Sequence, residues 1–124
     1  MTNEIPSGMY KEHILELYKS QSNFGILENA THKYTSYNSV CGDEITVNLL
    51  VKEGVVKDVK FGGSGCVISI VASSLLTNKI KSMKVSEVKK IRPEEVLELL
   101  KVKLNLARIK CALLGFEAVK GALK

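Results

Sequence analysis

The segment from Val67 to Met83 constrains the fold more than any other part of this sequence. It is apolar around nearly its whole circumference at helical spacing. A helix without a polar face is buried on all sides in a soluble protein. We therefore expect a central helix over this segment, with the rest of a 124-residue chain packed around it. Its small polar residues are Ser69, Ser73, Ser74, Thr77 and Asn78, and we interpret the three serines as aids to close helix packing.

Two segments upstream of this helix alternate apolar and polar residues, which is typical of half-buried strands. Ile45–Val51 and Val55–Phe61 are separated by Glu53-Gly54, which supplies a turn, so the sequence predicts an antiparallel hairpin. The run Gly62-Gly63-Ser64-Gly65 is expected to end the second strand sharply, because glycine freely adopts positive φ values. Tyr34–Tyr37 is expected to form a short edge strand, which gives a sheet of about three strands.

Helical patterns flank these strands in the sequence. Tyr10–Lys19 reads as a first amphipathic helix, Ser86 is expected to cap a short helix, and Pro93 is expected to open another with acids in its first turn. One amphipathic helix is expected from Leu106 to Leu123, packed on the sheet. The sequence therefore predicts an α+β fold, with a small antiparallel sheet packed against helices on one face, in a single domain over residues 1–124.

The composition argues against several classes of function. The net charge of +5 comes from scattered basic residues without interleaved aromatic residues, which favours a solvated basic surface over nucleic-acid binding. No run of about 18 apolar residues occurs, and the N-terminus has no apolar segment preceded by positive charges. We therefore expect a cytoplasmic protein with no membrane partner. The sequence leaves its oligomeric state open.

The three cysteines lie at element boundaries or off the expected core face. Cys41 precedes the hairpin in the turn-like Cys41-Gly42-Asp43, and Cys66 follows the glycine-rich run at the start of the central helix. Cys111 lies about 200° around the last helix from Ile109, away from the main apolar stripe. An odd number of cysteines cannot all pair within one chain, and in a reducing cytosol they more often bind metals, perform chemistry or are simply buried.

Together with Asp43, the cysteines offer the donor atoms of a metal site. A helix N-terminus favours the thiolate form of Cys66, and Cys41 and Asp43 are close enough in sequence to reach one ion. Three thiolates and one carboxylate complete a tetrahedral set for zinc, or for one side of an iron–sulfur cluster. The long spacings match no compact zinc finger and no Cys-x-x-Cys pair is present. From the residues alone, the cysteines are therefore either ligands or buried side chains.

Three ordered motifs resemble those of the NifU-N/IscU/SufU family of iron–sulfur assembly proteins. They are Cys41-Gly42-Asp43 before an alternating strand, Phe61-x-Gly63-x-Gly65-Cys66-x-Ile68-Ser69-x-x-Ala72-Ser73-Ser74-Leu75, and Arg108-Ile109-Lys110-Cys111. The resemblance extends from about Tyr10 to Ala122 and implies the IscU/SufU-like fold. It also implies that Cys41, Cys66 and Cys111 bind a metal or cluster, with Asp43 as the adjacent carboxylate, which in this family is associated with cluster lability.

The resemblance further implies a function and its partners. The expected protein is a scaffold rather than an enzyme: it receives sulfur from a cysteine desulfurase, assembles a transient [2Fe-2S] cluster and relays it to recipient apoproteins or cluster carriers. Cys41 and Cys111 are the candidate persulfide acceptors. Two alternatives stay open, a Zn2+-bound sulfur-transfer partner of the desulfurase and a purely structural zinc domain. Thiolates suit both metals, so the sequence does not decide between zinc and a cluster.

The third motif differs from the IscU pattern and looks like that of SufU. IscU-like members carry a histidine just before the third cysteine and a Leu-Pro-Pro-Val-Lys chaperone-docking segment upstream, whereas this chain has Lys110 and Leu104–Arg108 at those places. SufU-like proteins usually carry an insertion before the motif, and the segment between Cys66 and Cys111 is too short to hold it. Lys110 and Arg108 flank Cys111 and are expected to favour its thiolate through their positive charge.

Overall fold

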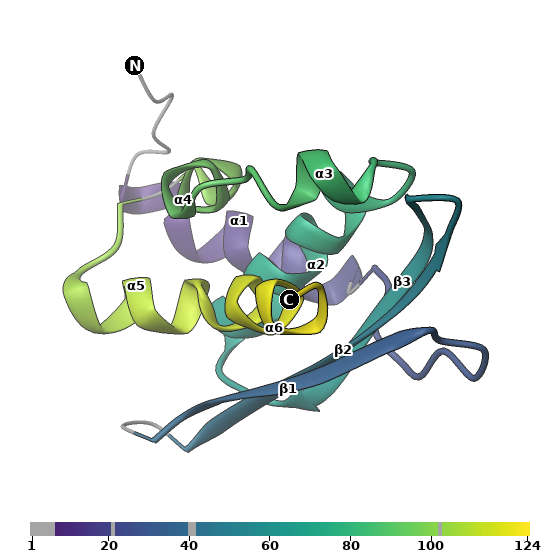
Figure 1. Cartoon of the computed structure of the whole chain (residues 1–124). Coiled ribbons are helices and arrows are strands. Elements are labelled where there is room, and N and C mark those ends of the chain that lie inside the picture. Colours follow the sequence, from purple (N-terminus) through teal and green to yellow (C-terminus); the bar gives the residue numbers. More distant parts are fainter. Residues whose placement is uncertain (1–6, 21, 40–41, 102) are drawn as a thin grey trace.

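The described residues form a three-stranded antiparallel sheet with helices on one of its faces (Figure 1). The computed structural model describes residues 7–20, 22–39, 42–101 and 103–124. The strands are β1 (His32–Asn38), β2 (Asp43–Lys52) and β3 (Val55–Ser64), in the spatial order β1-β2-β3. The helices are α1 (Ser7–Ser20), α2 (Val67–Ile80), α3 (Val85–Val88), α4 (Pro93–Leu100), α5 (Leu106–Ala112) and α6 (Leu114–Ala122). The predicted α+β class and three-stranded sheet are confirmed.

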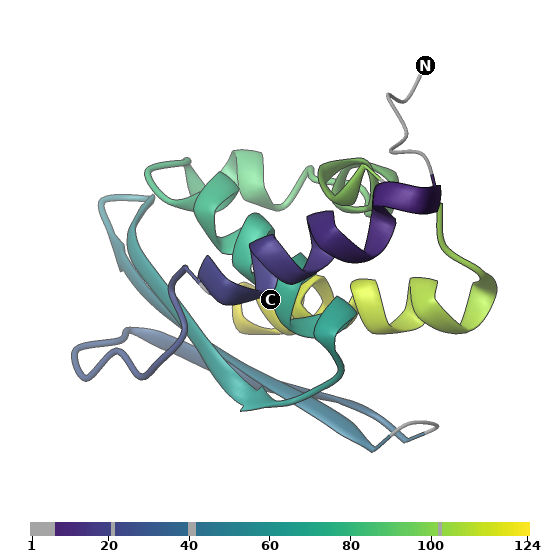
Figure 2. The same ribbon diagram turned by 180° about the vertical axis from the view of Figure 1, so that it is seen from behind.

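Helix α2 is the central helix that its uniformly apolar sequence predicted. It contacts β3, α1, α4, α5 and α6, and Figures 1 and 2 show α1 and α6 on opposite sides of it. The helix ends at Ile80 rather than at Met83, because Lys81 turns to an extended conformation and Ser82 has a φ of 75°. The N–H of Ser82 then donates to the carbonyl of Val56, which connects the end of the helix to the start of β3.

The register of the hairpin brings the start of β2 beside the end of β3. The sequence predicted that the second strand ends at Phe61. Glu44 instead pairs with Ser64, so β3 continues through Gly62 and Gly63. Gly63 has a φ of 123°, and a Cβ at this position would collide with the backbone carbonyl of Glu44. Glycine is therefore what keeps the two strands paired here. The chain leaves the sheet at Gly65 and enters α2 directly afterwards.

The C-terminal segment forms two helices rather than the single helix expected from its apolar spacing. Helices α5 and α6 are separated by Leu113, which has φ −93° and ψ 0°. Helix α6 packs on β1 and β2, as predicted, whereas α5 packs on α2 and α4. The break changes which residues are buried. Leu106 is 83% exposed, although a continuous helix would have placed it in the core.

The remaining helices follow their local signals with one exception. Helix α4 begins at Pro93, as predicted, and the carboxylate of Glu95 accepts a hydrogen bond from the N–H of Arg92. Helix α3 has Lys84 as its N-cap, so the predicted cap at Ser86 is wrong. Among the helices of the described residues, none combines the length and apolarity that crossing a membrane requires.

In the part of the chain that the structure describes, two hydrophobic clusters form the core. The first, which we call the sheet cluster, joins the inner face of the sheet to α2 and α6; it includes Ile45, Leu49, Phe61, Leu76, Leu114 and Phe116. The second, which we call the helix cluster, lies between α1, α2, α4 and α5; it consists of Ile14, Ile68, Val71, Ala72, Leu100, Cys111 and Ala112. The helix cluster contains a cysteine, so the candidate site adjoins this smaller cluster.

Candidate metal centre

Three of the four predicted ligand residues lie together. A carboxylate oxygen of Asp43, the Sγ of Cys66 and the Sγ of Cys111 are all within 4.8 Å of one another. Bond lengths of about 2.0–2.3 Å place the ligand atoms of one tetrahedral zinc ion roughly 3.5 Å apart. Small side-chain rotations therefore suffice to bring these three atoms onto one ion. The fourth predicted ligand, Cys41, lies outside the described residues.

Each of the three residues comes from a different element, and the fold explains why they meet. Asp43 is the first residue of β2 and Cys66 is the N-cap of α2, and the pairing of Glu44 with Ser64 sets them side by side. Cys111 lies on α5, which packs against α2. The N–H of Cys66 donates to Oδ2 of Asp43 at 3.2 Å. The carboxylate thus lies at a helix N-terminus, where the helix dipole stabilises negative charge.

Cys111 is more buried than the helical wheel suggested. Its side chain is 5% exposed and belongs to the helix cluster. The helical wheel placed Leu106 and Ile109 on the buried face, but α5 stops at Ala112, and Leu106 is exposed while Ile109 is only half-buried. The sequence left open whether the cysteines are ligands or buried side chains. Cys111 is both buried and close to the other candidate ligands, so the two interpretations are compatible.

Cys66 is a half-buried free thiol that ionises readily. Burial opposes ionisation, but hydrogen bonds from the side chain and backbone of Ser69, from the side chain of Cys111 and from the backbone of Ile68 outweigh it, so the pKa of Cys66 lies below its ordinary value. The thiolate is the form that binds metals. The sequence predicted a favoured thiolate at this helix N-terminus, and the hydrogen bonds act in the same direction.

Ser69 is a polar residue of the site whose contacts the sequence did not reveal. Its Oγ lies 3.2 Å from Oδ2 of Asp43, 3.1 Å from the carbonyl oxygen of Cys111 and 3.6 Å from the Sγ of Cys66. The residue is completely buried. We had interpreted it as a small residue that eases helix packing. The available signal was its place one helical turn after Cys66, which puts both side chains on the same face of α2.

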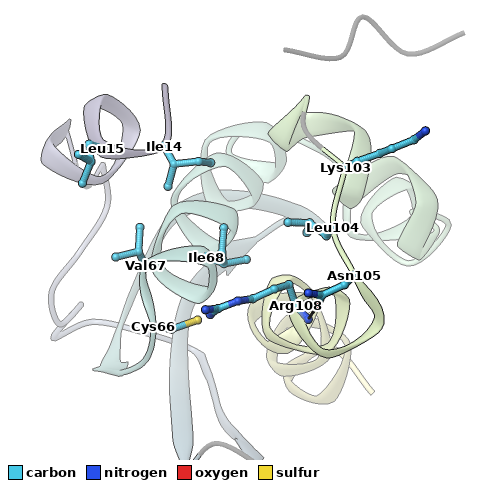
Figure 3. Close-up of a pocket in the computed structure, with 9 residues that line it drawn as sticks. All are labelled: Ile14, Leu15, Cys66, Val67, Ile68, Lys103, Leu104, Asn105 and Arg108. Atoms are coloured by element: carbon cyan, nitrogen blue, oxygen red, sulfur yellow. Dashed lines mark hydrogen bonds between the residues drawn. The ribbon is translucent and has the colours of Figure 1, made fainter. Parts of the chain in front are cut away.

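The two cations expected to flank Cys111 are both exposed on α5. Figure 3 shows the Arg108 side chain extending toward Cys66 across an open groove of about 650 Å³, whose walls include Ile14 and Leu104. Arg108 and Lys110 both line a second pocket of about 640 Å³ next to Cys111. The Arg108 side chain is therefore directed toward Cys66, and both residues border the pocket beside Cys111.

Comparison with known sequences points to one family. The family model described as the NifU-like N terminal domain matches residues 9–124. The iron–sulfur cluster assembly scaffold protein IscU of Thermotoga maritima is 37% identical, over 94% of this chain and 93% of that protein. The scaffold protein IscU of Escherichia coli strain K12 is 28% identical, over 92% of this chain and 91% of that protein.

Solved structures show the same fold. A SufU of Fervidobacterium islandicum AW-1, described as an iron–sulfur cluster assembly scaffold protein for the SUF system, matches with a TM-score of 0.78 at 28% identity and covers 96% of this chain and 100% of that chain. A NifU-like N-terminal protein of Brucella abortus, at 21% identity and a TM-score of 0.76, covers 93% of this chain and 92% of that chain and supports the fold alone. The IscU/SufU-like fold expected from the three motifs is confirmed.

Proposed function

The chain belongs to the NifU-like N terminal domain family, and we propose on this premise that it is a scaffold on which iron–sulfur clusters are assembled. The proposed site consists of Asp43, Cys66 and Cys111, with Cys41 as the fourth ligand. One observation carries the proposal: a carboxylate and two thiols from three separate elements converge within 4.8 Å. The relatives in sequence are named scaffold proteins rather than enzymes, and the proposed role needs no catalytic residue.

The donor atoms suit the proposed cargo. Thiolates are soft ligands for the iron of a [2Fe-2S] cluster and also for Zn2+. The lowered pKa of Cys66 supplies one thiolate readily. The carboxylate of Asp43 is a harder and weaker partner for iron, so we propose that its corner of the site is the one that exchanges. The cluster is therefore a transient cargo, with Zn2+ as the alternative occupant.

The proposed partners follow from this cargo. A cysteine desulfurase supplies sulfur, and recipient apoproteins or cluster carriers accept the finished cluster. The candidate persulfide acceptors are Cys41 and Cys111. Because the side chain of Cys111 is only 5% exposed, sulfur delivery there requires α5 to move away from α2. We place this function in the cytoplasm, in one domain over residues 1–124, without a nucleic-acid or membrane partner.

A zinc-bound sulfur-transfer partner of the desulfurase is the second candidate. Two observations favour it: Lys110 stands just before Cys111, where IscU-like proteins carry histidine, and a SufU structure matches nearly the whole chain. In this role the bound zinc would stay in place, and sulfur would pass through a single cysteine. A purely structural zinc domain is the simplest form of the same site, and it would leave a desulfurase unaffected.

Anaerobic purification separates these possibilities. The protein should be isolated without oxygen, and its iron, sulfide and zinc content measured together with its visible spectrum, before and after reconstitution with iron and sulfide. A scaffold shows charge-transfer bands that depend on Cys66. A zinc-bound partner holds one zinc and stimulates cysteine desulfurase turnover. If Cys66→Ser assembles a cluster and binds zinc as the unaltered chain does, the proposed site is wrong.

A further inference from the structure

We propose that Ser69 is a positioning residue that fixes the Asp43 carboxylate and thereby sets how tightly the site holds its metal. The inference rests on the proposed function, because it takes Asp43, Cys66 and Cys111 as ligands. It adds a buried hydroxyl that touches all three of these residues but is not itself expected to bind the metal. Ser69 is the residue on α2 that contacts the candidate ligands from both β2 and α5.

The hydroxyl of Ser69 is expected to donate its hydrogen to the carboxylate of Asp43. A serine hydroxyl has one hydrogen to donate, and two of its neighbours, Oδ2 of Asp43 at 3.2 Å and the carbonyl of Cys111 at 3.1 Å, can only accept. A charged acceptor forms the stronger bond, and the site is closed to water at this point because Ser69 is fully buried. The hydrogen therefore goes to Asp43 while Cys66 is a neutral thiol, which can itself donate to the oxygen of Ser69 at 3.6 Å.

The same carboxylate oxygen is held from a second direction. The N–H of Cys66 also donates to Oδ2 of Asp43, at 3.2 Å. One donor is a backbone group fixed by α2, and the other is the Ser69 hydroxyl on the next turn of that helix. Two donors from one rigid element define the orientation of the carboxylate before any metal arrives. Loss of the hydroxyl removes one of these two donors and so loosens the hold of α2 on the carboxylate.

Gly65 supplies the room that this arrangement needs. A Cβ added at Gly65 would lie 3.0 Å from the Cβ of Ser69 and 3.7 Å from the Cγ of Asp43. The first distance is shorter than side chains normally tolerate, so the serine would have to shift. The backbone of Gly65 is outside the left-handed region, so alanine can adopt its conformation. Gly65→Ala therefore shifts the side chain of Ser69 without removing its hydroxyl group.

Helix α2 offers a matched control for the loss of a buried serine hydroxyl. Ser74 is 5% exposed, and its Oγ donates to the carbonyl of Ser22 at 2.8 Å, away from the candidate ligands. Ser69→Ala and Ser74→Ala each delete one hydroxyl and one buried hydrogen bond on the same helix. A purely structural role predicts similar consequences for both variants. A positioning role predicts that only Ser69→Ala alters the metal site.

The test measures zinc affinity of the full metal-free chain by competition with a chromophoric chelator. Residues that orient a metal ligand typically change affinity by about 10- to 100-fold. We expect Ser69→Ala to weaken zinc binding by about tenfold, by no more than Asp43→Ala does, and Ser74→Ala to leave it unchanged. In the Asp43→Ala background, Ser69→Ala should have no further effect, because the two residues act as one unit. A further loss in that background would show that Ser69 acts through a cysteine instead, and would overturn the proposal.

Cobalt substitution adds a readout that a general loss of stability does not move. The visible ligand-field bands of bound Co2+ report its ligands and geometry, so Ser69→Ala and Gly65→Ala should shift them, whereas Ser74→Ala should not. If Ser69→Ala does not fold, Gly65→Ala carries the same test. Zinc affinity and cobalt bands equal to those of Ser74→Ala would refute the role of Ser69. If Cys66→Ser binds zinc as tightly as the unaltered chain, the proposed site itself has failed rather than this inference.

Discussion

The sheet cluster and the helix cluster are built from similar apolar residues but serve different ends. Side chains of the sheet cluster such as Ile45, Leu49 and Phe61 are fully buried, and none of its described members is a cysteine. The helix cluster is smaller, includes Cys111 and is bordered by the half-buried Cys66. Its neighbour Ser69 is fully buried and polar. We therefore expect the larger sheet cluster to contribute more to stability, whereas the helix cluster holds or borders the candidate ligands.

This difference predicts which substitutions should lower the stability of the fold and which should alter metal binding. A change at a sheet-cluster residue that is not a neighbour of the candidate ligands, such as Phe61, removes buried apolar surface and should lower stability without altering the ligands themselves. A change at the edge of the helix cluster should alter metal binding while the larger cluster keeps the chain folded. Paired substitutions can therefore test whether the two regions are separable.

The largest effect on folding is expected at Phe61. Its ring is fully buried and packs edge to face on Phe24, with ring centroids 5.3 Å apart. Phe61→Ala should lower the free energy of unfolding by about 3–5 kcal/mol, because it leaves a cavity in the sheet cluster. Urea unfolding of the metal-free protein measures this loss. Phe24→Ala removes the same contact from the side that is 43% exposed and should cost much less. Equal losses would mean that the sheet cluster is not the main source of stability.

The largest effect on metal binding is expected at Cys66. Cys66→Ser should weaken zinc binding by about 100- to 1000-fold, because the thiolates act together and serine is a poor ligand. The free energy of unfolding of the metal-free chain should change by less than about 1 kcal/mol, since the residue is only half-buried. Asp43→Ala should weaken zinc binding less than this, because water replaces a carboxylate more readily than a thiolate. A large loss of metal-free stability in Cys66→Ser would contradict the separation of the two regions.

The sequence predicted the parts of the molecule whose signals are local or periodic. The hairpin followed from the alternation of Ile45–Val51 and the Glu53-Gly54 turn, and α2 followed from a segment with no polar face. The candidate ligands followed from a family resemblance, while their convergence depends on the β2–β3 register and on α5 packing against α2. The spacing of residues within a single segment therefore could not predict that these ligands converge.

Other features could not be predicted because they depend on tertiary contacts. The break at Leu113 uses an ordinary helical residue, so the pattern of α5 and α6 looked continuous and Leu106 was assigned to the core. The role of Ser69 depends on the neighbours of its hydroxyl, which come from β2 and α5. A serine in an apolar helix has the same local signal whether it eases packing, as Ser73 does beside Gly115, or holds a ligand.

A moderate effect is expected in the reactivity of Cys66. Because its pKa is lowered, the thiolate should persist to lower pH than in an ordinary cysteine, and alkylation of the metal-free chain should reach half its maximal rate below the usual thiol range. Ser74→Ala, which loses a hydroxyl that donates to Ser22, should leave this midpoint unchanged. The rate is measured with iodoacetamide in a Cys41→Ser background, and mass spectrometry separates Cys66 from the buried Cys111.

The sign of the linked stability effect follows from the same shift. A thiol whose pKa is lower in the folded state stabilises the fold above its unfolded pKa, and this contribution is lost as the pH falls through the folded pKa. The metal-free chain should therefore lose this contribution on acidification. A midpoint for Cys66 alkylation at or above that of a free cysteine would contradict the prediction.

The smallest effect is expected on the rate of cluster transfer when Asp43 is replaced. At the site beside the helix cluster, we expect this carboxylate to promote release of the iron–sulfur cluster rather than its retention. The proposed thiolates hold iron through soft, strong bonds, whereas the carboxylate is a harder and weaker ligand that can leave and return. An exchangeable corner lets an incoming thiolate of a recipient protein begin the transfer. Asp43→Ala should therefore retain a reconstituted [2Fe-2S] cluster longer and transfer it a few-fold more slowly. The visible absorbance after addition of an apo-ferredoxin follows this transfer, with Ser74→Ala as the control for a substitution away from the site. Faster loss of the cluster from Asp43→Ala would show that this carboxylate chiefly stabilises the cluster, and the mechanism of an exchangeable corner would have to be abandoned.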